Sequence, residues 1–263
     1  MKYYEANLSN NSLKYFKIGK GRPLIYIPSF EGFLLTESIK ELSKSYEIFI
    51  PIIPGFSNTS KISEFESIED LSKLFIEFIE QIKADKVDLI GYSLGGYLGS
   101  WITVKRPDII DQLILISPLG FDLNDKKIEL KQHNFENLVY KYPDRFSDLN
   151  NNENIVNQDH LDLYSYEKLD EELLEKLSSL KNLTLILLGN DDMIVPSISG
   201  QIIKEKIEHS YFIYVYDSGH GIEIDQPKRV TTLLSDFLMR GQAFIVNWSG
   251  RDETEAPTRE MAN

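Results

Sequence analysis

Residues 91–96 form a G-Y-S-L-G-G motif whose composition and spacing suit a nucleophilic serine. The motif follows the apolar run 87–90 and precedes a stretch with helical character. A strand-to-helix turn this sharp strains its central residue, and side chains two positions to either side would collide. Gly91 and Gly95 avoid that collision. The pattern predicts that Ser93 lies over the N-terminal end of the next helix, where unpaired N–H groups favour a developing oxyanion.

A serine nucleophile needs a base, and the base needs an orienting carboxylate. The histidines of the chain are His133, His160, His209 and His220. The last of them follows the strand-like run 211–216 and stands between two glycines, which indicates a loop that can approach another element closely. The other three lie in polar or charged sequence, which favours solvated side chains. We therefore predict His220 as the base, although a surface histidine in a turn would give the same local pattern.

The carboxylate candidates are Asp191 and Asp192, which come soon after the apolar run 185–188. A run of this kind indicates a buried parallel strand, and such strands deliver functional residues at their carboxyl ends. Either aspartate could instead cap the helix expected to begin near Ser197. The residues alone leave the choice between them open.

The order serine, then acid, then histidine along the chain is that of one hydrolase fold. Over roughly residues 20–240 the chain resembles the α/β-hydrolase family. The resemblance is carried by the loop after the fourth strand, the nucleophile turn, the acid segment and the histidine segment, here at residues 52–57, 91–96, 189–196 and 219–227. The family's acid segment has a glycine, an aspartate three positions later and then a proline, and this register selects Asp192.

The resemblance implies a serine hydrolase that needs no cofactor and no metal. In it, Ser93 attacks the carbonyl carbon of a small ester or related acyl substrate, and His220 acts as general base. Asp192 holds the imidazole ring, and water clears the acyl-enzyme. The expected activity is that of a carboxylesterase.

Other activities fit the same three residues. The triad also supports C–C bond hydrolysis, thioester cleavage and perhydrolysis, and fold resemblance does not discriminate among them. A different reading is a ligand-binding protein of this fold that has lost turnover.

One segment departs from the family pattern. After the third strand the family usually has His-Gly, whereas this chain has Pro28 and Ser29. The register still predicts that the backbone N–H groups of Phe30 and Leu94 form the oxyanion hole. Glu31 places a carboxylate near this site, which supports the reading without turnover. Losing one oxyanion donor costs about 100- to 1000-fold in turnover, so a distorted hole predicts a slow enzyme.

Composition excludes several classes of protein. The 263 residues carry 28 basic and 41 acidic side chains, a net charge of −13, which disfavours nucleic acid as a partner. The chain has no cysteine, which excludes disulfides, thiolate metal sites and a cysteine nucleophile. The N-terminus lacks the apolar core of a signal peptide, and no apolar run could span a bilayer. We therefore expect a cytoplasmic protein with a small-molecule substrate; its oligomeric state stays open.

Apolar runs alternate with amphipathic stretches, which is typical of a parallel sheet wrapped by helices. We predict an α/β fold with a mostly parallel central sheet of about eight strands, helices on both faces and an inserted helical cap. The expected strands lie near residues 3–9, 12–18, 24–28, 46–50, 87–91, 112–117, 183–188 and 211–216. The expected helices lie near residues 34–44, 67–83, 94–105, 125–141, 168–180, 197–208 and 228–239.

The alternation breaks between residues 119 and 180, where the sequence is polar and rich in asparagine. In the resembled family an insertion at this place forms a cap over the nucleophile. We expect residues 1–118 and 181–240 to form the core and residues 119–180 to form the cap. The composition changes again in residues 241–263, which we expect to be a mobile C-terminal extension.

Overall fold

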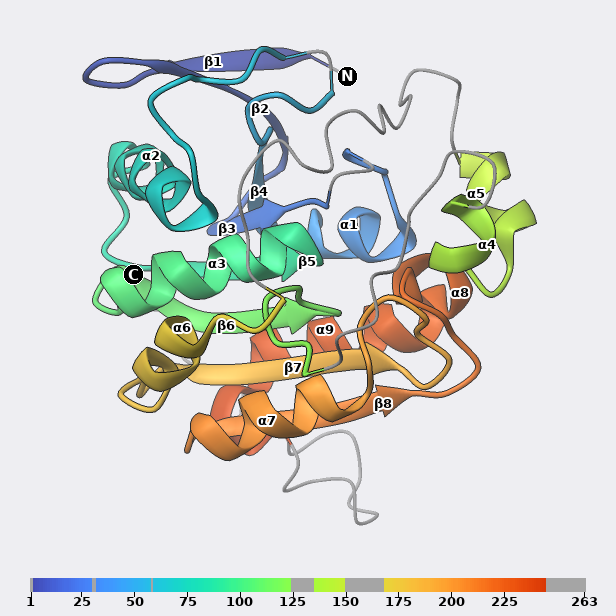
Figure 1. Ribbon diagram of the computed structural model, residues 1–263. Coiled ribbons are helices and arrows are strands. Elements are labelled where there is room, and N and C mark those ends of the chain that lie inside the picture. Colours follow the sequence, from blue (N-terminus) through green and yellow to red (C-terminus); the bar gives the residue numbers. More distant parts are fainter. Residues whose placement is uncertain (1, 30–31, 58, 124–134, 150–167, 245–263) are drawn as a thin grey trace.

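The computed structural model describes residues 2–29, 32–57, 59–123, 135–149 and 168–244, and its centre is a single eight-stranded sheet (Figure 1). The strands are β1 (Tyr3–Asn7), β2 (Ser12–Gly19), β3 (Arg22–Ile27), β4 (Tyr46–Pro51), β5 (Val87–Tyr92), β6 (Ile110–Ile116), β7 (Leu183–Gly189) and β8 (Ser210–Val215). Their order across the sheet is β1-β2-β4-β3-β5-β6-β7-β8. The two pairings of β2 are antiparallel, and all the others are parallel. The predicted mostly parallel sheet is confirmed.

Helices cover both faces of this sheet (Figure 1). They are α1 (Glu37–Leu42), α2 (Ile68–Gln81), α3 (Leu94–Lys105), α4 (Phe135–Val139), α5 (Pro143–Leu149), α6 (Glu171–Leu177), α7 (Ile198–Lys206), α8 (Ile222–Asp225) and α9 (Pro227–Arg240), followed by the 3₁₀ turn Gly241–Ala243. The apolar residues of α2, α3, α6 and α7 belong to one core cluster, and those of α1 and α9 belong to a second. The sheet therefore separates two apolar layers, as expected for this fold class.

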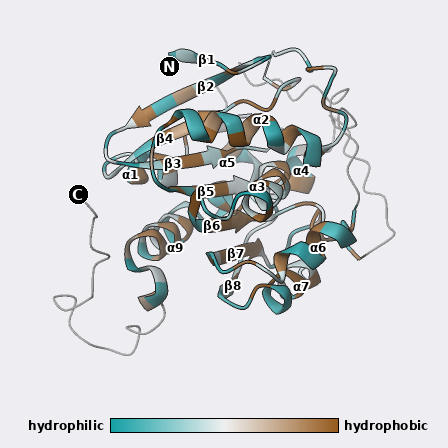
Figure 2. Cartoon of the chain, turned by 90° about the vertical axis from the view of Figure 1, so that its left-hand side faces the viewer, coloured by the Kyte–Doolittle hydropathy of each residue, from teal (hydrophilic) through white to brown (hydrophobic). Residues whose placement is uncertain are grey.

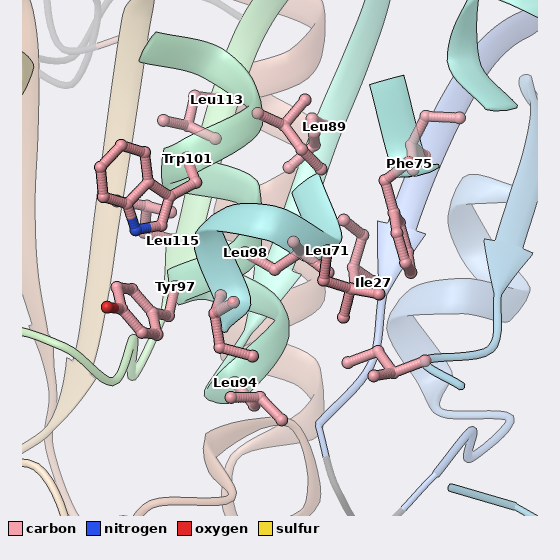
Figure 3. Packing of buried hydrophobic residues seen from close by; sticks show 14 of the residues in the cluster. Ile27, Leu71, Phe75, Leu89, Leu94, Tyr97, Leu98, Trp101, Leu113 and Leu115 are labelled. Atoms are coloured by element: carbon pink, nitrogen blue, oxygen red, sulfur yellow. The ribbon is translucent and has the colours of Figure 1, made fainter. Parts of the chain in front are cut away.

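Helix α3 lies at the centre of the larger cluster. Nearly all its residues are buried, which fits a helix that is apolar on every side. Figure 3 shows Leu98 and Trp101 of α3 among side chains from the sheet and from α2, including Leu89 and Phe75. By contrast, α2 is hydrophilic on its outer side and apolar toward the sheet (Figure 2). This packing fixes the helix that begins directly after Ser93.

The ends of the predicted cap lie side by side. Phe121 forms an isolated antiparallel bridge with Leu169, and the N–H of Asp170 donates to the carbonyl of Gly120 at 2.9 Å. Between these ends, the structure describes only residues 135–149. These contacts support the division into core and cap that we propose.

The chain near its C-terminus packs on the core before the described residues end. Phe244 follows the 3₁₀ turn and is buried between the rings of Tyr211 and Phe237, at centroid distances of 5.6 and 5.4 Å. Residues 245–263 of the predicted extension lie outside the described residues. Within the described residues, no helix combines the length and apolar character needed to cross a bilayer.

Strand register brings the carboxyl ends of the parallel strands to one edge of the sheet. Gly91 of β5 pairs with Ile27 of β3 and with Leu115 of β6, and Gly189 of β7 pairs with Val215 of β8. The loops that follow β3, β5, β6, β7 and β8 therefore meet at this edge, although they are far apart in sequence.

Candidate active site

Ser93 occupies the sharp turn between β5 and α3. Its backbone has φ 53° and ψ −113°, a strained conformation for a residue with a side chain. A Cβ atom on Gly91 would lie 2.4 Å from the carbonyl oxygen of Gly95, and one on Gly95 would lie 2.1 Å from that of Ile27. Both distances are impossible for real side chains, so the glycines are what permit the turn. The structure thus has the tight turn that the motif predicts.

The Ser93 hydroxyl is hydrogen bonded to His220, and His220 is hydrogen bonded to Asp192. The distance from Ser93 Oγ to His220 Nε2 is 2.8 Å, and that from His220 Nδ1 to Asp192 Oδ2 is 2.9 Å. The Ser93 and His220 residues and the Asp192 side chain are fully buried. With Nδ1–H donating to the carboxylate, Nε2 faces the Ser93 hydroxyl as an acceptor and can take the serine proton. This is the arrangement that a general base requires.

Asp192, and not Asp191, is the carboxylate that reaches the imidazole. Asp192 Oδ1 accepts two backbone N–H groups, from Ile194 and Val195, each at 2.8 Å, which leaves Oδ2 for the ring. Asp191 is exposed and binds Lys141 Nζ at 2.6 Å. The spacing rule taken from the family resemblance therefore selects the residue that the structure places beside His220.

The other histidines are not in this arrangement. The His209 side chain is half exposed, and its nearest acidic neighbour is Glu208 at 4.0 Å. His133 and His160 lie outside the described residues. Among the described residues, no three or more His, Asp or Glu side chains gather in a way that would hold a metal ion.

The loop that carries His220 is held by contacts that the sequence did not predict. Ser117, which follows β6, donates its hydroxyl to the His220 carbonyl at 3.1 Å. The Tyr92 ring lies 5.4 Å from the His220 ring, centroid to centroid. Ser117 is a polar residue directly after a buried strand, the same signal that identified the aspartate pair, and it could have been found in that way.

The predicted oxyanion donors fall partly outside the described residues. Leu94 begins α3, so its N–H belongs to the first turn, where helical N–H groups have no intrahelical acceptor. Phe30, the other predicted donor, and Glu31 lie outside the described residues. The carbonyls of Ile27 and Pro28 approach Gly95 closely, so the loop after β3 starts beside the nucleophile turn. The oxyanion hole remains a prediction.

A cavity of about 20 Å³ lies beside the nucleophile and histidine turns and has room for about one water molecule. It is lined by Tyr26, Gly32, Leu34, Thr36, Tyr92, Tyr140, Gly221, Glu223 and Ile224. A larger cavity, of about 790 Å³, is lined mostly by residues that flank the amino ends of β5 to β8 and contains none of the triad residues. Among the described residues, neither cavity is lined by Ser93, Asp192 or His220, but the smaller one is lined by Tyr92 and Gly221, which adjoin Ser93 and His220 in sequence.

Asp225 joins the histidine loop to the chain segment after α4. Its buried carboxylate accepts the backbone N–H of Gly219 at 2.8 Å, of Lys141 at 3.0 Å and of Tyr142 at 2.9 Å. Asp225→Ala would remove the partner of these donors, at about 1–3 kcal/mol for the buried N–H of Gly219 and less for each part-buried N–H of Lys141 and Tyr142. We expect the variant to lose about 3 kcal/mol or more of unfolding free energy in urea denaturation. Asp85→Ala, which changes an exposed aspartate, is the matched control; equal losses in the two would contradict this role.

Glu223 is a buried carboxyl group on α8 that the triad does not use. Burial raises the pKa of Glu223 above its ordinary value of 4.5, and hydrogen bonds from Tyr26, Thr36 and Ser38 oppose that rise. The unfolded chain therefore releases this proton at a lower pH than the folded chain does. Stability that the group contributes below pH 4.5 is lost as the pH rises toward the elevated folded pKa.

Glu223→Gln removes this titration. The melting temperature of the variant should therefore rise relative to that of the wild type as the pH is raised from about 5 toward about 9. Thermal melts across about this pH range test the expectation. Glu175→Gln, at an exposed site, controls for the loss of one negative charge. If the difference in melting temperature between Glu223→Gln and the wild type stays constant with pH, folding does not change the ionisation of Glu223 in this range.

The chain resembles known hydrolases in sequence and in fold. A family model described as alpha/beta hydrolase fold matches residues 23–157. The uncharacterized hydrolase YugF of Bacillus subtilis is 20% identical over 241 residues, covering 79% of this chain and 85% of that protein. Among solved structures, the meta-cleavage product hydrolase CumD from Pseudomonas fluorescens has a TM-score of 0.75 at 19% identity, covering 89% of this chain and 97% of that one. A thermophilic esterase from Thermogutta terrifontis has a TM-score of 0.74 at 18% identity, covering 90% and 98%. At these identities the structural likeness is one of fold.

Proposed function

The chain belongs to the alpha/beta hydrolase fold family, and we propose that it is a serine hydrolase that cleaves a small ester or related acyl substrate through an acyl-enzyme. The observation that carries the proposal is the unbroken hydrogen-bond chain from Ser93 through His220 to Asp192. Three loops separated by up to 127 residues meet in this chain of bonds. Burying three polar side chains costs free energy, and a catalytic role would explain why the protein contains this arrangement.

The proposed reaction begins with attack by Ser93 Oγ on the substrate carbonyl carbon, while His220 Nε2 takes the hydroxyl proton. Asp192 stabilises the imidazolium that forms. The Leu94 N–H, together with the predicted donor at Phe30, binds the oxyanion of the tetrahedral intermediate. As this intermediate collapses, the protonated His220 gives its proton to the departing oxygen, and the acyl group stays on Ser93.

Deacylation repeats these steps with water. His220 Nε2 removes a proton from a water molecule, whose oxygen attacks the acyl carbon. A second tetrahedral intermediate forms and collapses. The carboxylic acid leaves, and the imidazolium returns the proton to Ser93 Oγ. The net reaction consumes one water molecule and needs no other reactant.

We expect esters with short acyl groups to be the best substrates, because Ser93 is fully buried and the cavity lined by the neighbouring residues Tyr92 and Gly221 is small. A series of p-nitrophenyl esters from acetate to decanoate measures this preference. We expect kcat/KM to be highest for the shortest chains and to fall by an order of magnitude or more for the longest, at about 1.4 kcal/mol per tenfold. Highest activity on the long chains would contradict the small acyl site.

Thioesters and vinylogous diketones, assayed beside these esters, test the other reactions that this triad supports. The meta-cleavage product hydrolase and the esterase named above share the scaffold, so the panel decides between their substrate classes. Tight binding without turnover of any compound would favour a ligand-binding protein.

A further inference from the structure

Glu223 lies three residues after His220 and makes hydrogen bonds to two elements far away in sequence. Tyr26 Oη donates to Glu223 Oε2 at 2.5 Å, and Thr36 Oγ1 donates to Oε1 at 3.0 Å. The glutamate is 6% exposed, and the tyrosine and threonine are buried as well. Both carboxyl oxygens are therefore engaged, one by β3 and one by the residue that caps α1.

Tyr26 and Thr36 stand on either side of the loop that contains the predicted oxyanion donor Phe30. Tyr26 lies near the end of β3, and the carbonyls of the next two residues, Ile27 and Pro28, lie close to Gly95 in the nucleophile turn. Thr36 ends the loop, where it accepts the N–H of Ile39 at 3.3 Å as the cap of α1. One carboxyl group thus holds both ends of this loop.

The same carboxyl group is fixed to the histidine loop by the short helix α8. Glu223 lines the small cavity together with Tyr92, whose ring lies 5.4 Å from the His220 ring. Tyr140 also lines this cavity. Glu223 therefore connects the loop that carries the base with the loop that carries the predicted donor, through a buried and polar route.

A purely structural role explains this arrangement poorly. A buried carboxyl group costs free energy, and an apolar side chain of similar volume often serves a core equally well or better. Geometric control is a stronger reason for the group, because displacing catalytic groups by about 1 Å can cost on the order of 100-fold in rate.

We propose that Glu223 is a positioning residue, whose hydrogen bonds to Tyr26 and Thr36 set the spacing between the His220 loop and the oxyanion loop. This inference rests on the proposed hydrolase function. Glu223 touches no reacting atom. Its loss should therefore lower kcat and the affinity for a transition-state analogue, while KM stays nearly constant.

The test compares Glu223→Leu, which removes both hydrogen bonds, with Glu223→Gln, which keeps one accepting oxygen and presents an N–H that the other hydroxyl can turn to accept. Ser210→Ala is the control, because it removes a buried hydrogen bond to the Ile207 carbonyl near the amino end of β8. Kinetics use p-nitrophenyl acetate, and phenylboronic acid serves as the transition-state analogue. The downfield proton resonance of the His220–Asp192 hydrogen bond, measured by NMR, reports alignment without turnover.

We expect Glu223→Leu to lower kcat and the boronic acid affinity by about 10- to 100-fold, with KM changed less than about threefold. Its downfield resonance should shift or broaden. Glu223→Gln and Ser210→Ala should stay within about threefold of the wild type and keep the resonance. If the leucine variant does not fold, Glu223→Asp replaces it, since the shorter side chain cannot reach both partners at once.

Unchanged kcat, boronic acid affinity and resonance in Glu223→Leu would overturn the positioning role, even if its melting temperature falls. Failure of the proposed function looks different, because the wild type would then neither turn over esters nor react at Ser93. In that case the NMR resonance of the His220–Asp192 hydrogen bond still tests the positioning role. If Glu223→Leu keeps this resonance, the positioning role is wrong. If only Glu223→Leu loses it, the positioning role is supported.

Discussion

Ser93→Ala should lower kcat for p-nitrophenyl acetate on the order of a million-fold, to the level of the uncatalysed reaction plus residual binding effects. In the proposed mechanism, the serine is the only member of the triad that forms a bond to the substrate. Without its oxygen, His220 has no nucleophile to activate, and Asp192 orients a ring with nothing to deprotonate. A loss of this size corresponds to about 8 kcal/mol of transition-state stabilisation.

Ser100→Ala is the matched control for this variant. Ser100 is buried in the same helix, α3, and donates its hydroxyl to the Gly96 carbonyl at 2.9 Å. Its removal should leave kcat within about threefold of the wild type. Turnover that persists in the Ser93 variant would mean that another group performs the chemistry.

Asp192→Asn should lower kcat on the order of 10,000-fold while leaving the fold intact. The amide oxygen can still accept the N–H groups of Ile194 and Val195, which places the amide nitrogen toward His220. His220 Nδ1 would then have to accept a proton, so Nε2 would carry the ring proton and could not take one from Ser93. The loss should be visible in kcat at saturating ester.

Asp191→Asn changes the neighbouring carboxylate and serves as the control. That side chain is exposed and pairs with Lys141, so its loss should leave kcat nearly unchanged. Equal effects of the two substitutions would show that the acid has been assigned to the wrong residue. A large effect of Asp191→Asn alone would show the same.

Much of this architecture follows from local rules. Strands β1 and β2 lie close to the expected ranges 3–9 and 12–18 and pair as an antiparallel hairpin, and the run 87–92 followed by a glycine-bounded serine gives a buried strand and a tight turn. The choice of Asp192 over Asp191 came from the family resemblance, whose acid segment has the register seen here from Gly189 to Pro196. A Cβ atom on Gly189 would lie 2.0 Å from the Gly219 carbonyl oxygen, so this glycine is needed where the acid and histidine loops touch.

What the sequence did not reveal depends on contacts between distant segments. Nothing local to Glu223 indicates that its partners are Tyr26 and Thr36, 197 and 187 residues away. Helix α8 has only four residues, too few to show a helical period. Helix α5 begins at Pro143 in polar sequence, without an apolar stripe that would predict it.

The catalytic assignment is tested most directly by reaction of the purified protein with a fluorophosphonate, followed by intact mass measurement and peptide mapping. The proposed mechanism predicts one adduct per chain, located on the peptide that contains Ser93, and slowed labelling in Asp192→Asn. An unmodified protein, or an adduct located on another residue, would contradict the assignment of Ser93, His220 and Asp192 as a working triad.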